Sequence, residues 1–156
     1  MQLSDVFLRM GEENFQQLFR TISVGRLRTY QLFDRVKARF HLSKLNSEAI
    51  KKAAPRIWAR IGEKEEDFAT DVAQTILVSH LDMIIAILDH LGIPHEQGFF
   101  TKDEGIGEYL KDGWRESIWE KFKDSFPRVA LIFYINHLSV EVLKSEEDRK
   151  STRLNS

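Results

Sequence analysis

The chain has 156 residues, of which 42% are hydrophobic and 30% are charged, and its formal net charge is −1. This composition is typical of a water-soluble globular protein and excludes the disordered and fibrous classes. The absence of cysteine excludes disulfides, thiolate nucleophiles and cysteine-ligated metal sites, and it agrees with a reducing compartment.

No segment has the pattern of a membrane span or a secretory signal. The most apolar stretch, 76–91, contains two histidines and two aspartates, and it is shorter than the roughly 20 apolar residues that a membrane span needs. The N-terminus carries Asp5 and Arg9 among its apolar residues, which a secretory signal does not. We therefore expect a cytoplasmic protein without a membrane partner.

The last nine residues, 148–156, look like the translation of a common short-read sequencing adapter. The codons GAT-CGG-AAG-AGC-ACA-CGT-CTG-AAC-TCC encode this segment residue for residue. We expect this tail to be an artefact and exclude it from the arguments on fold and function. The natural chain is then expected to differ after Glu147.

Through the first 62 residues, apolar side chains recur at three- and four-residue steps, which is the period of an amphipathic helix. This spacing predicts one helix over 4–22, in which Gly11 lowers helix propensity without ending the helix. A second helix is predicted over 27–40. A third begins near Ser47, and Pro55 must kink it or begin a new helix there.

The strongest helical pattern covers 65–91. Acidic residues open this segment, where the helix dipole favours negative charge, and an apolar stripe continues to Leu91. Gly92 is expected to end the helix as its C′ residue, with Pro94 just beyond. This segment predicts a single long central helix. Residues 92–113 hold five of the eight glycines and predict an ordered loop with one short helical turn near 108–111.

Two further helices are predicted near the C-terminus. The first covers 114–126 and is ended by Pro127. The second includes 129–135, which has the composition of a buried strand. The apolar spacing continues to Leu143 and no other segment offers a partner strand, so we predict a helix. The sequence thus predicts an all-α fold, a compact bundle of five or six helices around the central helix, in one domain over 1–147.

The histidines are the strongest candidates for chemistry. His80 lies in the predicted central helix, while His137 and Glu141 are one turn apart on the last helix, a spacing that suits two metal ligands. If His80 and His137 met, with His95 or Glu141 added, an acid–base or metal site would form. The alternative, which we favour, is that these are ordinary core and surface residues, with no metal bound.

The loop 92–100 is a second candidate, as a binding site. It contains His95 and two adjacent aromatic residues, Phe99 and Phe100. We favour a structural role, in which both rings fold back onto the core. In the alternative, one or both rings present an aromatic anchor to a partner or line a pocket.

Charge is distributed unevenly along the chain. Residues 1–62 contain 12 basic and 5 acidic residues, whereas 63–147 contain 8 basic and 18 acidic residues. A basic face of this kind suits phosphate and is typical of nucleic-acid-binding helices. The alternative is that basic and acidic helices pair within the fold or across a dimer. The positive charge is concentrated in the second and third predicted helices, and the first five of these basic residues form the candidate binding face: Arg26, Arg28, Arg35, Lys37, Arg39, Lys44, Lys51, Lys52, Arg56 and Arg60.

The sequence contains no nucleotide-binding or hydrolase motif. We expect a non-catalytic helical domain that acts through protein–protein contacts, with a second copy of the chain among its candidate partners, and we expect no cofactor. Two alternatives stay open. One is a nucleic-acid-binding protein that uses the basic N-terminal half, and the other is a small enzyme with a histidine-based metal or acid–base site.

Overall fold

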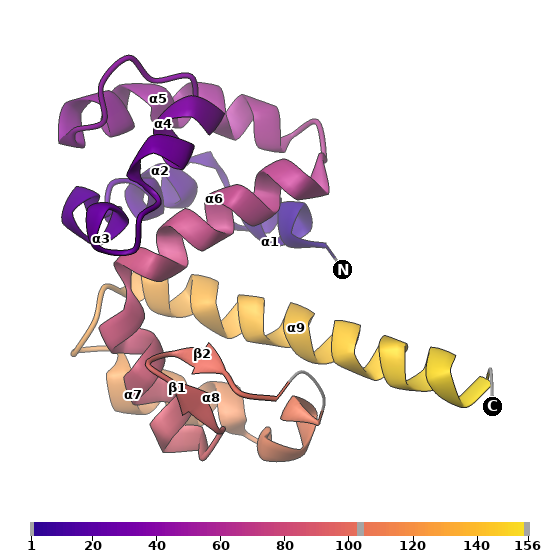
Figure 1. The fold of residues 1–156 in the computed structure, drawn as a ribbon. Helices are drawn as coiled ribbons and strands as arrows, with labels where there is room; N and C mark the ends of the chain where they lie inside the picture. Colours follow the sequence, from indigo (N-terminus) through magenta and orange to yellow (C-terminus); the bar gives the residue numbers. More distant parts are fainter. Residues whose placement is uncertain (1, 103–104, 155–156) are drawn as a thin grey trace. The chain divides into compact units, whose positions relative to one another are not determined.

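The computed structural model describes residues 2–102 and 105–154, with side chains as far as Val142. Within these residues the protein is all-α, which confirms the predicted fold class, and contains nine α-helices (Figure 1). The elements are α1 Leu3–Met10, α2 Glu12–Phe19, α3 Val24–Thr29, α4 Phe33–Arg39, α5 Ser47–Ile61, α6 Glu66–Ser79, α7 Leu81–Leu91, β1 His95–Glu96, β2 Phe99–Phe100, the 3₁₀ turn η1 Ile106–Tyr109, α8 Trp114–Phe122 and α9 Arg128–Leu154.

The chain divides into two compact units, the first over Gln2–His80 and the second from Leu81 onward. Each unit is described by itself below. The prediction of one domain over 1–147 concerns cooperative folding, which this division does not test, so it stays a prediction.

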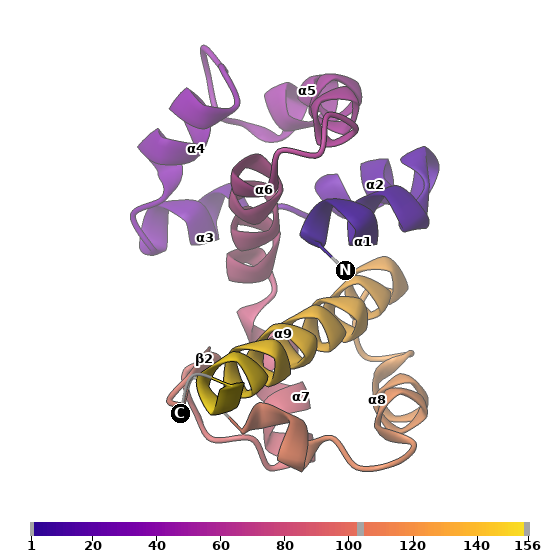
Figure 2. The ribbon, with the colours of Figure 1, turned by 90° about the vertical axis from the view of Figure 1, so that its right-hand side faces the viewer.

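The first unit is built around α6. This helix contacts α1 and α3, and α2 packs on α5 (Figure 2). The inward faces of these short helices carry large aromatic rings, so the core between them is rich in phenylalanine. The ring centroids of neighbouring pairs lie 5.3–6.0 Å apart, in the range of favourable aromatic contacts. The buried rings are Phe7, Phe15, Phe19, Phe40 and Phe68.

The predicted single helix over 65–91 is wrong, because α6 ends at Ser79 and α7 begins at Leu81. His80 leaves the helical conformation, with φ −124° and ψ 32°. Side chains at the break bond outside the helix: Ser79 Oγ accepts the backbone N–H of Ser23, and the His80 ring bonds Thr21. The apolar stripe runs through both helices, so periodicity alone does not reveal this break.

The number of helices was also underestimated, because two predicted helices are each broken. The segment 4–22 is divided at Gly11, whose φ of 85° is incompatible with a right-handed helix. The segment 27–40 is divided at Tyr30–Leu32, where Gln31 has a φ of 59°. By contrast, α5 runs continuously through Pro55, so no new helix begins there.

The second unit comprises α7, a short antiparallel hairpin, η1, α8 and α9. Gly92 ends α7 with a φ of 73°, as predicted. The run 129–135 is helical, which confirms the prediction of a helix over a strand. In this unit α8 contacts both α7 and α9, and η1 packs on α9. The helix α9 extends to Leu154 and therefore includes most of the tail 148–156, whose side chains lie outside the described ones.

Among the described helices, none is by itself long and apolar enough to cross a membrane. Only α6 and α7 taken together, across their break, reach the length and composition of a span.

Candidate functional site

The hairpin after α7 is the most closely defined candidate site. Its strands pair His95 with Phe100 and Glu96 with Phe99, so two residues, Gln97 and Gly98, form the turn. Both have positive φ, 52° and 94°, as a type I′ turn requires. This turn matches the right-handed twist of two strands and therefore favours a tight hairpin. The sequence predicted a loop here, without a hairpin.

Glycine is required at position 98 for a second reason, which is the close approach of the turn to α7. A Cβ atom at this position would lie 3.0 Å from Leu81 Cδ2 and 3.6 Å from Ile84 Cγ2. The turn backbone therefore packs directly on two buried side chains of α7. This contact holds the hairpin against its helix.

The imidazole of His95 stabilises the same hairpin through hydrogen bonds at both ring nitrogens. Its Nδ1 atom accepts the backbone N–H of Gly98 at 3.1 Å, so the ring proton resides on Nε2, which donates to Asp89 Oδ1 at 2.6 Å. The side chain of His95 is only 12% exposed. Both ring nitrogens of His95 are therefore engaged, one with the turn and one with α7.

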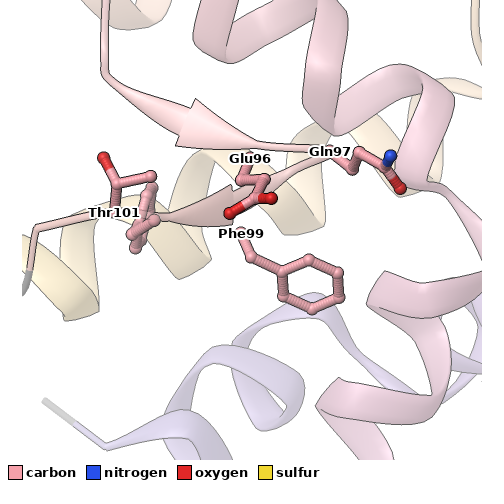
Figure 3. Close-up of a pocket in the computed structure, with 5 residues that line it drawn as sticks. Glu96, Gln97, Phe99 and Thr101 are labelled. Carbon is pink, nitrogen blue, oxygen red and sulfur yellow. The ribbon is translucent and has the colours of Figure 1, made fainter.

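The two phenylalanines of the hairpin are placed differently. Phe100 is half-buried, whereas Phe99 is 52% exposed and is one of two exposed large hydrophobic residues in the described chain. Figure 3 shows the ring of Phe99 projecting away from the hairpin ribbon. The expectation that both rings fold back onto the core is therefore wrong for Phe99. An open hollow beside the ring is lined by Glu96, Gln97, Phe99, Phe100 and Thr101.

His137 and Glu141 share a face of α9, as predicted, but they do not form a tight pair. His137 Nε2 lies 3.9 Å from Glu141 Oε1, which is beyond hydrogen-bonding distance. His137 is 9% exposed, and its Nδ1 atom is buried without a hydrogen-bond partner. Burial lowers the pKa of His137 to about 4, so the ring is neutral at pH 7. Burial, and then the charge of Glu141, raise the pKa of Tyr134 beside it.

His80 lies in the first unit, whereas His137 and Glu141 lie in the second. The His80 ring bonds the hydroxyl of Thr21, with 2.7 Å between Nε2 and Oγ1, and burial lowers its pKa. Since Thr21 Oγ1 donates its proton to the carbonyl of Leu18, it accepts from His80, and Nε2 carries the ring proton. Within the described chain, no group of three or more histidine or acidic side chains is arranged to hold a metal ion.

One histidine pair was missed by the sequence analysis. His90, near the end of α7, places Nε2 2.8 Å from Ser117 Oγ on α8. This distance suits a base and a nucleophile, but a catalytic base also needs a third group to orient it. No side chain in the described ranges bonds His90 Nδ1. The sequence could not predict this contact, because His90 and Ser117 are 27 positions apart on different helices.

The predicted basic face is partly used within the fold. A single carboxylate on α6, that of Asp71, contacts two residues of α4: Arg35 Nη2 lies 2.9 Å from Oδ1, and Arg39 Nε lies 2.7 Å from Oδ2. The Arg39 N–H is not aligned for a hydrogen bond, so this contact is an ion pair. Arg28 stacks its guanidinium 4.0 Å from the centroid of the Phe33 ring.

Lys37 and Arg26 are half-buried. No carboxylate in the described residues pairs with Lys37. The structure therefore supports internal pairing for Arg35 and Arg39. Arg28 and Arg35 of this face are exposed, and a second group of exposed basic residues lies on α5 and in the connection before it.

Comparison of the chain with protein-family models, with curated proteins and with solved structures finds no match.

Proposed function

We propose that the protein is a non-catalytic helical interaction domain of the cytoplasm that binds another protein through its hairpin. The observation that carries this proposal is Phe99, which is 52% exposed although the backbone beside it is firmly held. We further propose that residues 1–147 fold as a single domain.

An exposed aromatic ring on a rigid support has the properties of a binding anchor. Complete burial of a phenylalanine side chain is worth about 1.5–3 kcal/mol, and about half of this is available from a ring that is 52% exposed. Most of this gain is kept on binding only if little conformational entropy is lost. The type I′ turn, the contact of Gly98 with α7 and the two hydrogen bonds of His95 fix the hairpin in advance. The adjoining hollow offers space for a partner side chain.

A site-specific photo-crosslinking experiment tests the proposal. Benzoylphenylalanine replaces Phe99 in the full chain, and the same residue at the exposed Lys111 serves as the control position. We expect one discrete adduct at position 99 and none above background at 111. An adduct of twice the chain's mass identifies a second copy as the partner. The added substitution Gly98→Ala strains the backbone at its φ of 94° and places Cβ only 3.0 Å from Leu81 Cδ2, so it should reduce the yield at position 99.

Equal yields at positions 99 and 111, or no adduct at 99, would exclude the hairpin as a binding site. Unchanged yield in the Gly98→Ala background would show that the support of the hairpin does not matter for binding.

A further inference from the structure

A row of exposed basic side chains follows the outer face of α5 and the connection before it. Lys51, Lys52 and Arg56 are exposed on the helix, and Lys44 is exposed in the connection. They point outward because the opposite face of α5 packs into the core of the first unit through Ile50, Ala53, Ala54, Ile57 and Ile61.

These four residues, named here the α5 basic face, are poor in carboxylate partners. Residues 20–62 contain eleven basic residues and only two acidic ones, Asp34 and Glu48. No carboxylate in the described part of the chain forms an ion pair with Lys44, Lys51 or Lys52. Arg56 uses one nitrogen, Nη2, to bond the carbonyl of Phe40 at 2.7 Å, and this bond fixes the guanidinium beside the end of α4.

The contrast with α4 matters here. The basic residues Arg35 and Arg39 of that helix share the carboxylate of Asp71, so part of their positive charge is offset within the fold. The α5 basic face has no such balance. Its charge is therefore available for an external anion.

We infer that the α5 basic face binds the phosphate backbone of nucleic acid without reading its sequence. Lys52 and Arg56 are one turn apart, about 6 Å along the helix axis, so neighbouring phosphates can engage both. The other outward positions are Glu48, Pro55 and Ala59, none of which is a large apolar residue that inserts into a lipid surface. None of these three residues is asparagine, glutamine or arginine, the side chains that most often read base edges, so Arg56 is the only such residue among the outward positions named here.

Binding of a short mixed-sequence DNA duplex to the full chain, measured by fluorescence anisotropy over a range of salt concentrations, tests this inference. The double variant Lys51→Glu and Lys52→Glu removes two phosphate contacts and keeps helix propensity, since glutamate and lysine rank alike. The matched control is Lys102→Glu with Lys111→Glu, which makes the same change in net charge at exposed positions of the second unit.

We expect the affinity of the parent chain to fall steeply with salt, because each bound phosphate releases counterions. The α5 double variant should bind at least about tenfold more weakly at low salt and lower the log–log salt slope by about 2. The control should stay within about twofold of the parent, and a second duplex of different sequence should bind equally well.

Three results would overturn the inference. The parent chain fails to bind DNA at low salt; the control variant weakens binding as much as the α5 variant; or vesicles containing anionic lipid bind the chain while DNA does not. Failure of this inference leaves the hairpin proposal untouched, because the two sites share no residue.

Discussion

The rings of Tyr134 and His137 stack with their planes 14° apart and their centroids 6.0 Å apart on one face of α9. The ring of Phe133 lies at the same centroid distance on another side of His137. This aromatic surrounding leaves the imidazole poorly solvated, and it is the physical reason why burial lowers the pKa of His137 to about 4.

The first prediction is that His137 makes the protein less stable in mild acid. In the unfolded chain the pKa of histidine is near 6.5, so below this pH the unfolded state binds a proton that the folded state rejects down to about pH 4. The contribution of His137 is therefore complete above 6.5 and is lost as pH falls. We expect a loss of about 2 kcal/mol between about pH 7.5 and pH 5.

Urea unfolding at both pH values measures this loss. His137→Gln, which does not titrate, should show a correspondingly smaller decrease in the free energy of unfolding between the two pH values. An identical decrease in parent and variant would assign the acid sensitivity to other groups.

The second prediction concerns the bond between His80 and Thr21. His80→Ala should lower the free energy of unfolding by about 1–3 kcal/mol, because packing is lost and the Thr21 hydroxyl loses its ring donor. Urea unfolding monitored by circular dichroism provides the measurement. Thr21→Ser keeps the hydroxyl and serves as the control, with a loss below about 1 kcal/mol. A control that costs as much as His80→Ala would contradict this account of the bond.

The third prediction concerns the carboxylate that α4 shares with α6. Asp71→Asn removes two ion pairs at once and should cost about 1 kcal/mol, since exposed pairs contribute about 0.2–1 kcal/mol each. The cost should decrease in high salt, because salt screens partly exposed pairs. Glu63→Gln is the control, an exposed residue with the same charge change. A cost that does not respond to salt would point to packing instead of charge.

The fourth prediction concerns the tail. Removing 148–156 should leave the melting temperature unchanged within error, because a translated adapter has no selected contacts. Thermal unfolding of the shortened and complete chains measures this directly. A clear decrease in melting temperature on removal would argue that these residues belong to the protein.

Periodicity predicted the fold class well. It located the helical segments and the end of α7 at Gly92, and it assigned 129–135 to a helix because the apolar spacing continues beyond the run. It failed at the breaks. His80 and Gln31 leave the helical conformation through contacts and turn geometry that a one-dimensional pattern does not contain.

The site was predicted less well, for a related reason. Charge counting found the basic half of the chain, but only the structure shows that Arg35 and Arg39 form ion pairs with Asp71 while Lys44, Lys51 and Lys52 form none with the described carboxylates. The sequence likewise singled out His95 and Phe99, but their different roles depend on a turn whose second residue, Gly98, packs on α7.

The proline within α5 has a consequence for the exchange of amide hydrogens with solvent. Pro55 has no N–H, so the carbonyl of Lys51 lacks its usual donor within the helix. The hydrogen-bond ladder of α5 is therefore interrupted between its first two turns and its remainder. Deuterium should enter the amides of 50–54 through local opening that leaves the bonds after Pro55 intact. We therefore expect the segment that carries Lys51 and Lys52 to exchange its amide hydrogens faster than the part of α5 after Pro55.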